Sequence, residues 1–273
     1  TISAHISSLE KELNARLFVR NTKEVKLSDD GKDLYRYARQ MIDLQKKIEE
    51  RFETGKEESK HLITIAASTI PAQYLLPKIL MKFNERYPKE QVKLLETDSS
   101  QVVTQIIDHM VDVGFTGTVL EKKHCKYIPF YKDELVVITP NTEKYQKLLE
   151  DMPDDISWIG GEHLIMREEG SGTRKEAGKQ LRAAGINLDK LKIIASIENQ
   201  ETIKKSVKQG MGISVISRLA AEEEVKYGDL LAFSIPKADQ GRDINLVYNK
   251  NYQMSKSTER FVKIVKEIYG IEE

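Results

Sequence analysis

The segment Leu62–Thr118, LITIAASTIPAQYLLPKILMKFNERYPKEQVKLLETDSSQVVTQIIDHMVDVGFTGT, decides the fold class. Short apolar runs rich in β-formers alternate in it with segments of helical spacing, which predicts strands at 62–68, 91–98 and 111–118 and helices at 72–88 and 99–110. Strands that alternate with helices form a parallel sheet with helices packed on its faces. This part of the chain is therefore predicted to be an α/β lobe.

The same alternation continues downstream and predicts a second α/β lobe. Strands are expected at 163–168, 192–198, 211–217 and 243–250, and helices at 173–185, 201–210 and 258–270, with Gly185 and Gly210 as helix stops. We assign subdomain I to about 62–137 and 240–273, and subdomain II to about 138–239. Ligands of such sheets collect where strands end and helices begin.

The residues before the first lobe predict a separate unit. Ile2, Ile6, Leu9 and Leu13 lie on one helical stripe that has nothing upstream to pack against, so we expect the chain to be truncated at its N-terminus. Two short apolar pieces, 17–19 and 25–27, bracket the polar turn Asn21-Thr22-Lys23 and predict a hairpin or wing. Residues 1–27 are thus predicted to form one small domain.

A long helix is predicted from Ser28, as N-cap, to about residue 58. Its apolar residues recur at spacings of three and four and form a narrow seam: Leu34, Tyr37, Met41, Leu44, Ile48 and Phe52. A seam of this width favours a second copy of the same helix as partner. The alternative is a linker helix that lies on its own domain. The charged stretch Thr54–Lys60 marks the boundary before the lobes at 62–273.

Composition narrows the class of protein. The 43 basic and 43 acidic residues cancel among 273, so net charge neither supports nor excludes a nucleic-acid partner. No apolar run approaches the roughly 20 residues that span a bilayer, and the first residues lack a signal-peptide pattern, which predicts a cytoplasmic protein. The single cysteine, Cys125, is interpreted as a strand residue. The scattered histidines lack metal-ligand spacing, so we predict no metal, cofactor or catalytic residue.

Polar turns follow the predicted strands and point to an anion site. The candidate binding residues in these turns are Ser68, Thr69, Ser99, Gly170, Ser171, Gly172, Thr173 and Asn199. Hydroxyls, amides and backbone N–H groups at helix starts favour an oxyanion or carboxylate. Each turn taken alone also fits an ordinary N-cap. The loop 170–173 has more than a cap requires, because glycines on both sides of Ser171 open the backbone to a ligand. Arg174 is expected either to bind the ligand or to pair with Glu168 or Glu169.

Eight residues near the start of the chain form one pattern: Ser3, Ile6, Leu9, Glu10, Leu13, Leu17, Phe18 and Arg20. This pattern resembles the second half of the winged helix-turn-helix of LysR-type transcriptional regulators. The stretches 67–88, 167–174 and 208–217 look like landmarks of that family's effector domain. The likeness covers essentially the whole chain and is most similar to the branch that includes regulators of sulfur assimilation and carbon fixation.

The resemblance implies a partial winged helix-turn-helix, a linker and dimerisation helix, and two Rossmann-like subdomains similar to a periplasmic binding protein. It places Ser3 and Ala4 where a recognition helix meets double-stranded DNA, with Thr1, His5 and Ser7 close by and Arg20 and Lys23 on the wing. It implies a small anionic effector bound by Ser68, Thr69, Ser99, Ser171 and Thr173, and a homodimer or homotetramer.

Two positions depart from the family pattern. At the fourth turn a Glu198-Asn199-Gln200 triplet replaces a small Gly-Ser-Thr-like one, so the carboxylate of Glu198 would repel an anion unless it points away or pairs with Arg174. Thr116 stands where an acidic residue often precedes Gly117.

The preferred function is a DNA-binding transcriptional regulator whose promoter occupancy changes when a small anion binds between the lobes. The alternative is a solute-binding receptor of the same two-lobed fold, which would need a secretion signal. A third class, an anion-transforming enzyme, would need an acid, base or metal in the cleft, and the turns offer none that stands out.

Overall fold

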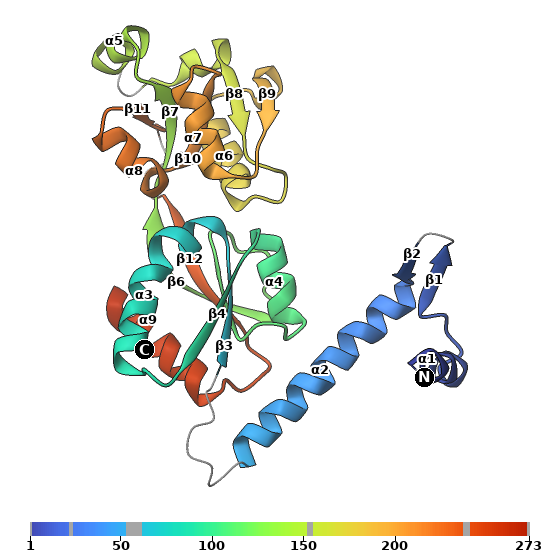
Figure 1. Ribbon diagram of the computed structural model, residues 1–273. Coiled ribbons are helices and arrows are strands. Elements are labelled where there is room, and N and C mark those ends of the chain that lie inside the picture. Colours follow the sequence, from blue (N-terminus) through green and yellow to red (C-terminus); the bar gives the residue numbers. More distant parts are fainter. Residues whose placement is uncertain (1, 22–23, 53–61, 152–154, 237–240, 272–273) are drawn as a thin grey trace. The chain divides into compact units, whose positions relative to one another are not determined.

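The computed structural model describes residues 2–21, 24–52, 62–151, 155–236 and 241–271. The chain divides into two compact units, one that contains α1 to α2 and one that contains β3 to α9 (Figure 1). Within the described residues, no helix is both long and apolar enough to cross a membrane.

The first unit is a helix, a hairpin and a long helix: α1 (Ile2–Glu12), β1 (Phe18–Asn21), β2 (Glu24–Leu27) and α2 (Asp29–Phe52). The hairpin is antiparallel, and Phe18 pairs with Leu27. Ser28 caps α2 as expected, because its Oγ accepts from the Gly31 amide at 2.9 Å. The predicted turn residues Thr22 and Lys23, and the boundary segment 54–60, lie outside the described residues.

Three contacts at the Leu17 backbone hold α1, the hairpin and α2 together. The Glu10 carboxylate accepts from the amide of Leu17 at 2.8 Å, which ties α1 to the start of the hairpin. Gly31 lies directly against the Leu17 backbone, since an added Cβ would lie 2.0 Å from the Leu17 carbonyl oxygen. Ser28 donates its own amide to that oxygen at 2.9 Å. Only glycine fits where α2 crosses this strand.

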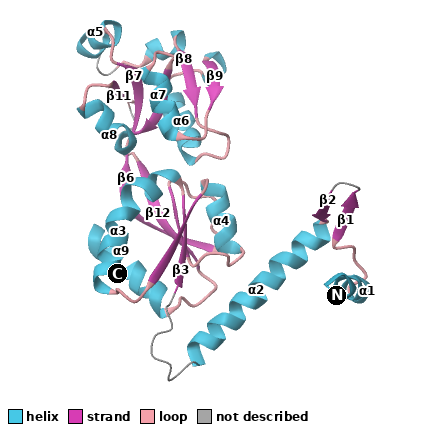
Figure 2. Cartoon of the chain, viewed as in Figure 1, coloured by secondary structure: helices cyan, strands magenta, loops and turns pink. Residues whose placement is uncertain are grey.

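The first lobe of the second unit is a five-stranded sheet with the strand order β4-β3-β5-β12-β6. Its elements are β3 (Leu62–Ala67), the π-helical turn η1 (Pro71–Leu75), α3 (Leu76–Arg86), β4 (Gln91–Glu96), α4 (Ser99–Ile107), β5 (Val113–Thr116), β6 (Cys125–Asp133), β12 (Arg242–Asn249) and α9 (Lys256–Tyr269). Strand β3 runs parallel to β4 and β5, as predicted, and β12 runs antiparallel to β5 and β6. Helices α3 and α9 pack on one face around Phe83 and Phe261, and α4 covers the other around Val102 and Ile106 (Figure 2).

The second lobe is a five-stranded sheet with the order β11-β7-β10-β8-β9. Its elements are β7 (Leu135–Pro140), α5 (Glu143–Asp151), η2 (Ser157–Gly161), β8 (His163–Met166), α6 (Gly172–Ala183), η3 (Leu188–Lys190), β9 (Lys192–Ser196), α7 (Gln200–Lys208), β10 (Ile213–Ser217), α8 (Arg218–Lys226) and β11 (Leu230–Ser234). The expected helix stops, Gly185 and Gly210, adopt positive φ angles of 90° and 82°. One core cluster contains residues of both lobes, including Ile70 and Ile203, so the lobes pack as one unit.

The chain crosses between the lobes twice, between β6 and β7 and between β11 and β12. The predicted subdomain border at residue 137 was placed too late, because β7 begins at Leu135 and pairs along its whole length with β10 and β11. Only Glu134 separates β6 from β7. The charged residues Lys132, Asp133 and Glu134 interrupt the apolar pattern at this point and mark the change of sheet more closely than residue 137 does.

Candidate functional site

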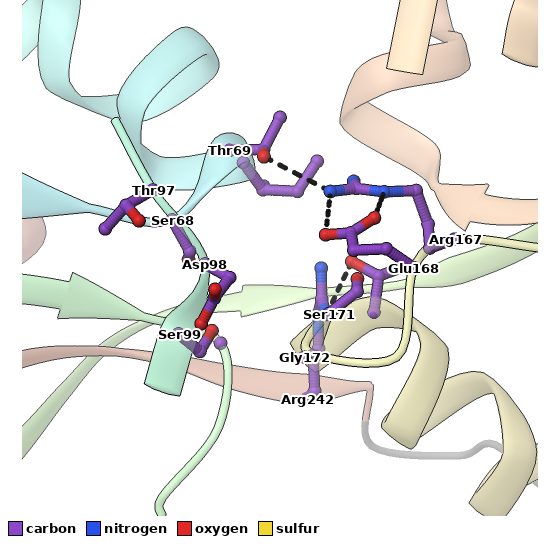
Figure 3. Close-up of a pocket in the computed structure, with 13 residues that line it drawn as sticks. Ser68, Thr69, Thr97, Asp98, Ser99, Arg167, Glu168, Ser171, Gly172 and Arg242 are labelled. Atoms are coloured by element: carbon purple, nitrogen blue, oxygen red, sulfur yellow. Dashed lines mark hydrogen bonds and ion pairs between the residues drawn. The ribbon is translucent and has the colours of Figure 1, made fainter. Parts of the chain in front are cut away.

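A small polar cavity lies between the lobes, where β3, β4, β5 and β8 end. It is lined by Ser68, Thr69, Ile70, Thr97, Asp98, Ser99 and Gly117 of the first lobe, by Arg167, Glu168, Ser171, Gly172 and Thr173 of the second, and by Arg242 at the start of β12. Figure 3 shows side chains of the two lobes facing each other across this space. The room left for the centres of water molecules is about 20 Å³, enough for about one ordered water.

The structure brings six of the eight predicted effector residues to this cavity: Ser68, Thr69, Ser99, Ser171, Gly172 and Thr173. They come from three strand-to-helix turns. The turns after β3 and β4 lie together because these strands are parallel neighbours in one sheet, and the turn after β8 belongs to the sheet of the other lobe. The start of α6 forms part of the wall, and its amide groups favour negative charge.

The loop at 170–173 links the lobes closely. The Ser171 hydroxyl caps α6 by accepting from the Arg174 amide at 3.3 Å. Thr173 Oγ1 accepts from Arg242 Nη1 at 3.0 Å. A Cβ added to Gly172 would lie 2.6 Å from Thr118 Oγ1 and 2.9 Å from Ser99 Oγ. Glycine is therefore needed at 172 for the second lobe to approach the first this closely.

Two predicted residues do not line the cavity. Asn199 caps α7 by accepting from the Thr202 amide at 3.0 Å, which is the capping role that the sequence had left open. Gly170 lies beside Asp98: a Cβ added to Gly170 would be 3.3 Å from the carboxyl carbon of Asp98. Glu198 is exposed and is not part of the lining, so the expected conflict between its charge and an anion does not arise in this structure.

Arg174 takes neither of its two expected roles. Its Nη1 donates to the Arg167 carbonyl at 2.8 Å and to Ser196 Oγ at 3.4 Å. The arginine that faces the cavity is Arg167 itself, which follows β8 and is only 6% exposed. Its Nε and Nη2 donate to the two oxygens of Glu168 at 2.8 and 2.9 Å, and Nη2 lies 3.5 Å from Thr69 Oγ1.

Arg242 supplies a second guanidinium at the crossing between the lobes. Its Nε donates to Asp133 Oδ2 at 2.9 Å, and Nη2 forms an ion pair with the same oxygen at 2.8 Å. Asp133 is almost fully buried and accepts from Ser217 Oγ at 2.5 Å through its other oxygen. Gly117 packs against the guanidinium, 3.2 Å from where its Cβ would be. Arg242 thus contacts both lobes and the site loop at once.

The sequence reasoning missed Arg167, Glu168 and Arg242 as lining residues. Arg167 carried a signal, because it is a charged residue near the end of the strand predicted at 163–168. Arg242 carried none, since its partner Asp133 lies 109 residues earlier in the chain. Asp98 also lines the cavity, but its Oδ1 accepts from the amides of Ser100 and Gln101 at 2.8 and 2.9 Å, which turns its charge toward the start of α4.

The donor set of the cavity suits an oxyanion: two guanidiniums, several hydroxyls and a helix start. In the part of the chain that the structure describes, no three His, Cys, Asp or Glu residues are grouped to hold a metal ion. Burial raises the pKa of the Cys125 thiol to about 11, so the thiol stays protonated near neutral pH and is a poor nucleophile.

The predicted DNA-contacting residues fall in the first unit. Ser3, Ala4, His5 and Ser7 are exposed on α1, a helix without a single buried residue. Arg20 lies in β1, and its side chain is not described. Thr1 and Lys23 lie outside the described residues.

Comparisons with known proteins bear on both units. A regulator of Methanocaldococcus jannaschii, the uncharacterized HTH-type transcriptional regulator MJ0300, is 29% identical over 98% of this chain and 89% of its own length. A probable RuBisCO transcriptional regulator of Gracilaria tenuistipitata is 28% identical over 96% of this chain and 85% of its own length, in agreement with the predicted branch. Both relatives are named as regulators rather than enzymes.

The fold agrees with solved structures of such proteins. The regulatory domain of Synechocystis CcmR, solved in complex with 2-PG, superposes with a TM-score of 0.68 and covers 77% of this chain and 98% of its own, at 23% identity. The family model for the LysR substrate binding domain matches residues 56–269. The chain therefore belongs to the LysR family of transcriptional regulators.

Proposed function

We propose that this regulator binds a small anionic metabolite in the cavity between its lobes and that binding changes its occupancy of promoter DNA. The observation that carries the proposal is the convergence of Arg167 and Arg242, both about 6% exposed, with the hydroxyls of Ser68, Ser99 and Ser171. Buried cations surrounded by donors favour an anion as their ligand. The complex of CcmR with 2-PG supports this ligand class for a protein of the same fold.

The first unit supplies the proposed DNA contact. Helix α1 presents Ser3, Ala4, His5 and Ser7 to solvent as the reading face, and Arg20 and Lys23 are assigned to phosphate contacts on the wing. A promoter-binding protein works where the DNA is, so the cytoplasm is its proposed location. No membrane partner is proposed.

Helix α2 supports a homodimer. Its apolar seam residues Tyr37, Met41, Leu44 and Ile48 are each more than half exposed in the single chain. A second copy of α2 would bury this seam and hold two reading helices on one duplex. Assembly of two such dimers into a tetramer is the second possible state.

Anion binding is tested by substituting Ser171. We expect Ser171→Ala to weaken binding of sulfate or phosphate by about three- to tenfold, since a lost hydrogen bond changes the free energy by about 0.5–1.5 kcal/mol. Isothermal titration of the unaltered protein and of the variant measures the change. A titration without any saturable binding of an oxyanion, or with equal affinity in both proteins, contradicts the assignment.

The matched control is Ser255→Ala. Ser255 also caps a helix, by accepting from the Thr258 amide at 3.1 Å at the start of α9, and it does not line the cavity. Both variants lose an N-cap worth about 1 kcal/mol of stability. Only the Ser171 variant should lose anion affinity, so the control separates a ligand contact from a weakened helix.

The wing assignment predicts a change in salt dependence. Lys23→Ala should weaken binding to a duplex of mixed sequence and reduce the slope of log K against log salt by about one, because one phosphate contact and its counterion release are lost. Fluorescence anisotropy at several salt concentrations measures both. Lys226→Ala, on α8 of the second unit, removes the same charge and should leave the slope unchanged. An unchanged slope for Lys23→Ala contradicts the wing contact.

A further inference from the structure

The chain places a carboxylate of its own on the arginine of the cavity. Glu168 and Arg167 are neighbours in sequence, and both line the cavity. The guanidinium donates to both carboxylate oxygens, at 2.8 and 2.9 Å. Figure 3 shows the Glu168 carboxylate turned toward this guanidinium. Two parallel hydrogen bonds from nitrogen atoms to two oxygens on one centre are also the geometry with which an arginine binds a carboxylate or phosphate ligand.

The two partners differ in the exposure of their side chains, although both backbones are held by hydrogen bonds, that of Glu168 through its carbonyl and the Ser171 amide at 3.1 Å. The carbonyl of Arg167 accepts from Arg174 Nη1 at 2.8 Å and from Ser196 Oγ at 3.3 Å, which fixes the backbone at the end of β8. Glu168 begins the loop that continues through the exposed residues Glu169 and Gly170. Its side chain is 23% exposed, against 6% for Arg167. Glu168 is therefore the partner with a route to solvent, while Arg167 stays in the cavity.

The space in the cavity does not admit both the Glu168 carboxylate and a ligand anion. About 20 Å³ is left for water centres, which is room for about one water, and a sulfate or carboxylate group is larger than one water. Removing Glu168 without replacement would leave Arg167 as a buried unpaired charge, which is strongly unfavourable. An incoming oxyanion that takes the place of the Glu168 carboxylate finds the space it needs. It also provides Arg167 with a new charge partner.

We propose that Glu168 is a built-in competitor for the anion site, which the effector must displace from Arg167. This inference rests on the proposed anion binding and specifies the ligand further. The effector needs two oxygens on one centre to replace both hydrogen bonds, as in a carboxylate, sulfate or phosphate group. Competition lowers the affinity for such an anion, so Glu168 sets the concentration at which the regulator responds.

Neutralising the competitor tests the proposal. We expect Glu168→Gln to bind sulfate, a tetrahedral oxyanion, or acetate, a planar one, at least about tenfold more tightly than the unaltered chain, because a charge-assisted pair no longer has to be broken. Glu169→Gln is the matched control, since it removes the same charge from the adjacent, exposed residue. Its affinity should stay within about twofold of the unaltered chain. Isothermal titration of the three proteins at one ionic strength gives the comparison.

A second variant keeps the test decisive if the unpaired arginine destabilises Glu168→Gln. The double substitution Arg167→Gln with Glu168→Gln leaves two neutral amides and no buried unpaired charge, and it should bind these anions more weakly than Glu168→Gln does. Equal binding by the two would show that Arg167 does not hold the anion and would overturn the proposal.

The outcomes separate this inference from the function on which it rests. Tighter binding by Glu168→Gln alone supports both, including the case in which only this variant binds measurably. Binding by the unaltered chain that stays equal or weakens in Glu168→Gln overturns the competitor role and leaves the anion site standing. An equal gain in Glu168→Gln and Glu169→Gln shows a general charge effect and overturns it as well. No binding of either anion by any variant overturns both.

Discussion

Asp133→Ala should lower the free energy of unfolding of the two-lobed unit by about 3–5 kcal/mol, the cost of leaving a buried charge without its partner. Asp133 is 1% exposed, forms an ion pair with Arg242, and accepts one hydrogen bond from Arg242 and one from Ser217. Without it the guanidinium stays buried where the two lobes meet. Urea unfolding followed by the fluorescence of Trp158, the single tryptophan, measures the change.

Asp243→Ala is the control for this prediction. Asp243 is the next residue after Arg242 and also forms an ion pair, with Lys132 at 2.7 Å, but both side chains of this pair are well exposed. Exposed pairs contribute about 0–1 kcal/mol, so this variant should remain close to the unaltered protein. A similar loss of unfolding free energy in the two variants would contradict the view that burial makes the Asp133–Arg242 pair critical for stability.

The alternating pattern of strands and helices was the part of the fold that could be predicted. Its period-two and helical spacings are local, so segments such as Leu62–Ala67 and Lys256–Tyr269 are visible in short windows. Strand β11 and helix α8 were not predicted. Helix α8 starts at Arg218, directly after the last residue of β10, so no turn residue separates the two elements. Prediction from sequence patterns needs turn residues between elements to separate one from the next.

The residues of the cavity also divide into those that could be predicted from the sequence and those that could not. Ser68, Ser99 and Ser171 were predictable because a strand, a polar turn and a helix start adjoin in sequence. Arg242 and Asp133 were not, because they face each other across the antiparallel pair β6 and β12, and no local pattern encodes the register of two strands 109 residues apart. Arg167 and Glu168 lie next to the predicted loop in sequence. The way their side chains face each other could be seen only in the structure, where the Arg167 carbonyl is held by Arg174 and Ser196.

Gly31→Ala should destabilise the first unit by up to about 3 kcal/mol, the cost of an overpacked site. The sign of this change in stability is informative, because replacing glycine by alanine within a helix ordinarily stabilises the helix by about 1 kcal/mol. Here the new Cβ would lie 2.0 Å from the Leu17 carbonyl oxygen, a backbone atom that also accepts from the Ser28 amide. The start of α2 must therefore move away from the hairpin.

Hydrogen exchange of the amides of α1, β1 and β2 measures this loss within the intact chain, and faster exchange in Gly31→Ala is the expected result. Gly160→Ala is the control, since nothing lies within 4 Å of the Cβ it would add. Unchanged or slower exchange in Gly31→Ala would mean that the helix propensity of alanine outweighs the contact. The close crossing of α2 and the Leu17 backbone would then not be what holds α1 and the hairpin in place.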